Sequence, residues 1–160
     1  PGLAAGVMLH RRIDSFAEMH AAFRRSRSRV SEGRRRYGGI MVDMFYDHFL
    51  AAHWPRFSTQ PLTAFTAETY RLIETHGEPL LEAFAPVFAR MAAQDWLASY
   101  RDSSSVALAL GRMAQYRLRQ PNPLAGAGEE LLQEYAGLET DFLAFLPDAL
   151  AFAEQVRRAR

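Results

Sequence analysis

Cysteine is absent from the 160 residues, and lysine is absent as well. Without thiols the chain can form no disulfide, no thiolate metal site and no cysteine nucleophile. Any bound metal must therefore be held by His, Asp, Glu or water, and such ligands suit Mn, Mg, Fe or Zn rather than Cu(I) or an iron–sulfur cluster. All 19 basic residues are arginine, whose planar guanidinium group binds carboxylates and phosphates in a bidentate manner.

Long apolar runs and strand-like patterns are also scarce. No apolar run approaches the roughly 18 residues needed to cross a bilayer, and no secretory signal is recognisable. We therefore expect a cytoplasmic protein without membrane contact. Alternation of period two is rare, whereas apolar residues recur at helical spacing among abundant Ala, Leu, Arg and Glu. These features predict an all-α fold, a compact helical bundle that forms a single domain over residues 1–160.

The expected helices are bounded by capping residues, glycines and prolines. One helix covers about 3–13, and Asp14 or Ser15 caps a second that reaches Arg29. Further helices are expected at about 39–53, 62–76, 78–93, 95–100, 103–116 and 128–145. Pro86 predicts a kink within 78–93, and Pro147 is expected to open a last helix. The helical pattern begins at once after Pro1, from which we expect an upstream segment to precede it.

Charge is distributed unevenly although the net charge is only +1. Residues 1–56 hold ten arginines and five acidic residues, and residues 57–160 hold nine arginines and thirteen acidic residues. Clustered positive charge accelerates association with an acidic partner. The candidate partner-binding residues are Arg24, Arg25, Arg27, Arg29, Arg34 and Arg35. A solvated face without any partner is the commonest alternative, and nucleic acid is a weaker one because no aromatic residues are interleaved with the arginines.

The first candidate site lies in the segment of His10 and Asp14. On a helix these residues are four apart and share one face, so a nitrogen and a carboxylate oxygen could converge on one cation. Arg11 and Arg12 lie beside them and could hold phosphate oxygens. An ordinary surface pair of His and Asp explains the same spacing.

The second candidate site lies in the segment of Asp43, Asp47 and His48. The two aspartates are four apart within a strongly apolar stretch, where a carboxylate is costly to bury unless it is paired or bound to metal. His48 adds a nitrogen ligand or a proton carrier. Ion pairs with arginines of a neighbouring helix would account for the same aspartates.

Five segments together resemble the acyl carrier protein phosphodiesterase family. They are GVMLHRRID at 6–14, VDMFYDHFLAAHW at 42–54, WLASYRD at 96–102, GRMA at 111–114 and YAGLETDF at 135–142. The resemblance implies a fold similar to the helical HD-domain hydrolases, with an altered metal-site pattern. It also implies a divalent cation, typically Mn²⁺, and hydrolysis of the phosphodiester that joins 4′-phosphopantetheine to a serine of acyl carrier protein. That carrier is small and strongly acidic, which suits the basic N-terminal residues.

The resemblance implies a role for each candidate residue. The metal ligands or their neighbours are expected to be His10, Asp14, Asp43, Asp47 and His48. Asp47 and His48 are also catalytic candidates, and Arg11 and Arg12 would offset charge that grows on the phosphate. Which carboxylate acts as base and which binds metal is left open. The family's usual His-containing Leu-Ala-His motif and the Asp-containing motif after it are absent from these residues, so we expect part of the metal site to lie upstream.

Three other functions are compatible with parts of the pattern. A non-enzymatic helical module that binds an acidic protein explains the arginines without the Asp and His pairs. A nucleotide phosphohydrolase similar to HD-domain enzymes shares the metal and the fold. An RNA-binding helical protein would show steep dependence of binding on salt.

Overall fold

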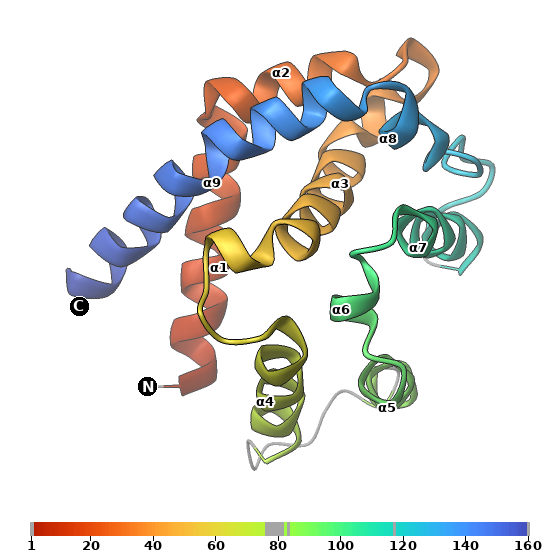
Figure 1. The fold of residues 1–160 in the computed structure, drawn as a ribbon. Coiled ribbons are helices and arrows are strands. Elements are labelled where there is room, and N and C mark those ends of the chain that lie inside the picture. Colours follow the sequence, from red (N-terminus) through yellow and green to blue (C-terminus); the bar gives the residue numbers. More distant parts are fainter. Residues whose placement is uncertain (1, 76–81, 83, 117, 160) are drawn as a thin grey trace. The chain divides into compact units, whose positions relative to one another are not determined.

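The structure is a computed structural model that describes residues 2–75, 82, 84–116 and 118–159. The described residues form helices and turns without any strand, which confirms the all-α prediction (Figure 1). None of the helices in these ranges combines the length and the apolar character needed to span a membrane.

The described residues fall into two compact units, and the sequence prediction of a single domain stays a prediction. The terminal unit contains residues of 1–46 and 129–160, and the central unit contains residues of 47–128. The division lies within helix α3 (Gly38–Ala52), which contributes its first part to the terminal unit and its last part to the central unit.

The terminal unit is built from helices that come from both ends of the chain. It contains α1 (Gly2–Met19), α2 (Ala21–Arg29), η1 (Glu32–Tyr37), the first part of α3, α8 (Glu129–Gln133) and α9 (Tyr135–Arg158). The long helix α9 packs against both α1 and α2, and it lies beside α2 in Figure 1. The two ends of the sequence therefore build one core.

Aromatic side chains fill the core of the terminal unit. Tyr46 lies at its centre, with its ring centroid 5.6 Å from that of Phe23, 5.4 Å from Phe142 and 5.3 Å from Phe145. Phe16 stacks on the Phe152 ring at 4.6 Å. Because these rings come from α1, α2, α3 and α9, aromatic packing holds the four helices together.

The central unit consists of short helices. It contains the last part of α3, η2 (Trp54–Arg56), α4 (Leu62–Glu74), α5 (Ala85–Ala93), α6 (Trp96–Ser99) and α7 (Ser103–Tyr116). One cluster in its core joins Ala51, Trp54 and Leu62 to partly buried side chains that include Tyr100. The indole Nε1–H of Trp54 donates to the Gln60 carbonyl at 2.6 Å, which fixes the turn between η2 and α4.

Asp95 organises the connection between α5 and α6. Its backbone is left-handed, with φ 43° and ψ 61°, and its carboxylate accepts hydrogen bonds from the Thr66 hydroxyl at 2.9 Å and the Ala98 N–H at 3.2 Å. The Tyr70 hydroxyl donates to the same carboxylate at 3.3 Å. These hydrogen bonds hold a conformation that a non-glycine residue adopts only at a cost.

The predicted helix boundaries at Asp14 and Pro147 are wrong, and the predicted helix 128–145 is divided between α8, which ends at Gln133, and α9, which begins at Tyr135. α1 continues through residue 14, because the Asp14 carboxylate accepts from His10 instead of capping a following backbone N–H. The break falls at His20, whose Nδ1 accepts from the Ala22 N–H and caps α2. α9 likewise continues through Pro147, since Phe145 and Ala149 are buried on either side of the missing hydrogen bond.

The predicted kink at Pro86 is also wrong. Pro86 occupies the first turn of α5, where a backbone N–H has no partner within the helix, so it begins this helix instead of bending it. The predicted start of that helix, at residue 78, lies outside the described residues.

Candidate active site

The first candidate pair lies on α1 of the terminal unit. His10 Nδ1 is 2.9 Å from Asp14 Oδ2, and the side chains of both residues are mostly exposed. Because α1 is continuous, Glu18 extends the same face by one further turn. Arg11 and Arg12 are exposed, and helical periodicity turns them roughly 100° and 200° away from His10.

Asp43 lies on α3 and interacts electrostatically with the α1 face that carries His10, Asp14 and Glu18. The pKa of its carboxyl is raised because surrounding protein atoms partly remove it from water, although the residue remains at the surface. The negative charges of Asp14 and Glu18 raise the pKa further, and His10 acts in the opposite direction. The Asp43 carboxyl therefore lies close enough to two other carboxylates and one imidazole for their charges to affect its pKa, and a carboxyl with a perturbed pKa is typical of a functional site.

His48 lies in the central unit and is buried, with 4% of its surface exposed. Its Nδ1 is 2.9 Å from the carbonyl oxygen of Tyr100. Since a carbonyl only accepts, Nδ1 must carry the hydrogen, and the lone pair of the neutral ring is then on Nε2. The hydrogen bond to a carbonyl fixes one tautomer and one ring orientation, as is usual for histidines that bind metals or carry protons.

Asp47 and Asp102 add charge near this histidine within the central unit. Burial raises the pKa of the Tyr100 hydroxyl, and the charge of Asp47 raises it further. The backbone N–H of Ser104 donates to Asp102 Oδ1 at 2.9 Å and lowers the pKa of Asp102, with a smaller effect from His48. Tyr100 and Asp102 were not among the predicted site residues, because a separation of about fifty residues from His48 leaves no periodic signal.

The donor set fits a divalent cation in part. His10 supplies a nitrogen and Asp14 a carboxylate, and both types suit Mn²⁺. Across the ranges that the structure describes, no group of three or more His, Asp or Glu side chains is arranged to hold a metal ion. Within those ranges His10 and Asp14 could supply two donors to a cation, which is fewer than a group of three.

The predicted partner-binding arginines divide into two groups. Arg25 and Arg29 form ion pairs with Asp141, Arg27 with Glu18, and Arg34 with Glu130. Arg24 and Arg35 are exposed, and within the described part of the chain their guanidinium groups have neither a hydrogen bond nor an ion pair. Carboxylates of α8 and α9 thus match much of the positive charge of the N-terminal residues, and the charge asymmetry of the sequence reflects helix packing to that extent.

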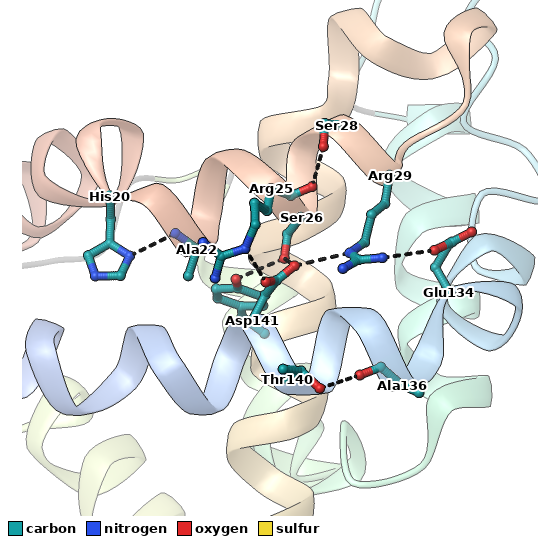
Figure 2. A network of polar contacts seen from close by, with 11 residues as sticks. His20, Ala22, Arg25, Ser26, Ser28, Arg29, Glu134, Ala136, Thr140 and Asp141 are labelled. Carbon is teal, nitrogen blue, oxygen red and sulfur yellow. Dashed lines mark hydrogen bonds and ion pairs between the residues drawn. The ribbon is translucent and has the colours of Figure 1, made fainter.

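Asp141 is the most deeply buried of these carboxylates, and sequence reasoning did not single it out. It is 2% exposed, and it accepts from Arg25 Nε at 2.8 Å, Arg29 Nε at 3.0 Å and the Ser26 hydroxyl at 3.2 Å (Figure 2). The Ser26 hydroxyl also bonds the Tyr46 hydroxyl at 2.9 Å. Spacing could not reveal this network, because more than 110 residues separate the arginines from Asp141.

Comparisons with known proteins agree with the residue patterns. The family model described as acyl carrier protein phosphodiesterase matches residues 1–149. A protein of Photorhabdus laumondii subsp. laumondii with that name is 31% identical, over 95% of this chain and 77% of the relative.

Two further proteins with the same name extend this result. One from Serratia proteamaculans is 31% identical over 96% of this chain and 80% of its own length. One from Shigella boydii serotype 18 is 30% identical over 96% of this chain and 79% of its own length. No solved structure matches significantly. The matched range 1–149 contains every candidate metal and catalytic residue. The chain belongs to the acyl carrier protein phosphodiesterase family and is a phosphodiesterase.

Proposed function

We propose that this chain hydrolyses the phosphodiester that joins 4′-phosphopantetheine to a serine of acyl carrier protein. The products are the apo form of the carrier and free 4′-phosphopantetheine. The observation that carries this proposal is the family match over residues 1–149, together with relatives that bear the name of this activity. The oriented imidazole of His48 and the acidic face around Asp43 supply the kinds of groups that such hydrolysis needs.

A divalent cation, Mn²⁺ in the first instance, is part of the proposal. When bound, it would polarise a phosphoryl oxygen and lower the pKa of a water molecule. Its proposed ligands or near neighbours are His10, Asp14, Asp43, Asp47 and His48. The absence of thiols and the His–Asp pair on α1 support nitrogen and oxygen coordination.

The chain's own residues would carry the proton and the charge. In the reaction a water oxygen bonds to phosphorus, the bond from phosphorus to the serine oxygen breaks, and a proton reaches the serine oxygen. Asp47 or His48 accepts the proton of the attacking water, and the hydrogen bond from His48 to the Tyr100 carbonyl keeps that ring oriented. Arg11 or Arg12 would offset negative charge that grows on the phosphoryl oxygens.

The direct test follows the intact mass of purified holo-acyl carrier protein. The carrier is incubated with this protein and Mn²⁺, and then with a chelator in place of the metal. We expect the carrier to lose the phosphopantetheine mass only in the presence of metal. A carrier that stays intact here, while a relative from Serratia cleaves it under the same conditions, would contradict the proposal and favour a binding module. Cleavage that survives the chelator would contradict the metal dependence alone.

A matched pair of variants tests the catalytic assignment. Asp47→Ala should abolish turnover while the helical circular dichroism stays near that of the wild type, because Asp47 is exposed. Glu68→Ala, at an exposed carboxylate on α4, should leave turnover unchanged. Normal turnover by Asp47→Ala would remove this residue from the mechanism.

A further inference from the structure

A single buried carboxylate, that of Asp141, holds two arginine side chains of α2 in place. Asp141 on α9 accepts from the Nε atoms of Arg25 and Arg29, one carboxylate oxygen for each (Figure 2). A guanidinium group has five N–H donors, and these contacts use the one nearest the chain. The outer nitrogens of Arg25, whose side chain is 54% exposed, remain for other acceptors, whereas Arg29 Nη1 also contacts Glu134 at 3.4 Å.

Gly137 makes room for the second guanidinium group. A Cβ atom at this position of α9 would lie 2.3 Å from Arg29 Nη1 and 2.4 Å from Arg29 Cζ. The guanidinium group therefore lies directly on the backbone of α9, and any side chain at residue 137 would displace it. A glycine within a helix is less favourable than an alanine, so packing of this arginine offers a physical reason for its presence.

The spacing of the two arginines defines what they can bind. Four residues along a helix correspond to a rise of roughly 6 Å. Carboxylates four residues apart on another helix have the same spacing, so two acidic side chains of one helix can meet Arg25 and Arg29 together. Arg24 is exposed beside them, and Glu134 contacts Arg29 Nη1 only at 3.4 Å on the surface.

We propose that Arg25 and Arg29, oriented by Asp141 and seated on Gly137, bind carboxylates of an acidic helix of the carrier protein. This inference rests on the proposed function, because it takes the substrate to be that acidic protein. Arg25 and Arg29 contact the partner, and Asp141 and Gly137 are positioning residues. Orientation before binding lowers the entropy cost of ordering long side chains at an interface.

The test measures affinity for apo-acyl carrier protein by calorimetry, alongside kcat and KM with the holo form. Arg25→Gln should raise Kd and KM about tenfold and leave kcat unchanged. Gly137→Ala should weaken binding in the same direction although it adds no charge and improves helix propensity. Arg157→Gln, an exposed arginine near the end of α9, is the control and should bind as the wild type does.

The outcomes separate this inference from the proposed function. Wild-type cleavage of the carrier with unchanged affinity in Arg25→Gln and Gly137→Ala would overturn the inference and leave the function standing. An equal loss in Arg157→Gln would also overturn it, because diffuse charge would then explain binding. Inorganic phosphate should compete with the carrier no better than chloride at equal ionic strength, and stronger competition would show a phosphate site instead. A wild-type protein that neither binds nor cleaves the carrier would remove both proposals.

Discussion

Glu130 shows how a single carboxylate joins η1 and α8 in the terminal unit. The residue is 6% exposed, and Oε2 accepts from the Ser31 N–H at 3.0 Å. Oε1 accepts from the Ser31 hydroxyl at 2.6 Å and from Arg34 Nη1 at 2.7 Å. Burial acts to raise the pKa of Glu130, but these hydrogen bonds outweigh it and hold the pKa below the ordinary 4.5.

The substitution Glu130→Gln should therefore destabilise the protein in a pH-dependent way. A lowered pKa means that the carboxylate contributes stability above pH 4.5, and that this contribution disappears as the pH falls through the value in the folded state. We expect a loss of about 1–3 kcal/mol at pH 7 that shrinks on acidification, measured by urea unfolding at several pH values. Glu129→Gln, at the exposed neighbouring position, should show little loss. An equal loss at all pH values would mean that packing dominates.

Tyr46 provides a prediction at the opposite end of the pH scale. Burial raises the pKa of its hydroxyl to about 12, against the bond with Ser26 that lowers it. The phenolate forms more easily in the unfolded chain, so stability is complete below pH 10 and declines toward pH 12. Tyr46→Phe should lose about 1 kcal/mol at neutral pH and show a flatter decline in urea unfolding above pH 10. Tyr116→Phe, at a residue 73% exposed, should retain the wild-type profile.

The sequence showed which residues could carry chemistry better than it showed which residues contact one another. Helical spacing correctly paired His10 with Asp14, because those atoms belong to adjacent turns. The same spacing offers His20 no acidic partner, whereas its Nε2 lies 3.1 Å from Asp148 Oδ2 and its Nδ1 caps α2. A pair separated by 128 residues depends on how α9 packs, which no local pattern encodes.

The sequence predicted helices correctly where apolar periodicity and flanking Pro or Ser residues were clear. The expected α4 and α7 agree with the structure within about two residues, since apolar periodicity and flanking Pro or Ser define them. The errors at Asp14 and Pro147 have a common cause. A capping residue or a proline marks a possible boundary, and tertiary packing decides whether the helix ends there.

Two glycines of the central unit allow a prediction about element packing. A Cβ atom at Gly128 would lie 2.4 Å from Ala107 Cβ and 2.6 Å from Ala107 Cα on α7, so the backbones themselves would have to separate. Gly111 on α7 has no atom within 4 Å of a Cβ in that position. Gly128→Ala should therefore destabilise the protein by about 1–3 kcal/mol through overpacking.

The matched variant Gly111→Ala should be stabilising by about 1 kcal/mol, because alanine has the higher helix propensity and meets no neighbour. Thermal unfolding of both variants beside the wild type checks the pair. Although both variants replace glycine by alanine, we expect Gly128→Ala to lower the stability and Gly111→Ala to raise it. A loss of stability in both would indicate that Gly111 contacts a surface beyond the described neighbours.

At the scale of the whole molecule, the charge asymmetry has two components. The basic excess of residues 1–56 is matched in part by Asp141, Glu130 and Glu134 of the C-terminal helices. The sequence revealed the asymmetry, and it could not show that part of it is satisfied within the fold. What remains exposed is available to an acidic partner, and among the predicted residues it includes Arg24, Arg35 and the outer part of Arg25.

Binding of Mn²⁺ should also appear in the stability of the whole chain. A ligand that binds only the folded state adds about 2.7 kcal/mol to the free energy of unfolding when its concentration is 100 times Kd. His10→Ala combined with Asp14→Asn should abolish this gain while the metal-free protein unfolds close to the wild-type temperature, because both side chains are mostly exposed. Asp148→Asn, which removes a carboxylate of the same unit that contacts His20, should keep the full gain. Equal stabilisation by Mn²⁺ in all three proteins would place the cation away from the His10–Asp14 face.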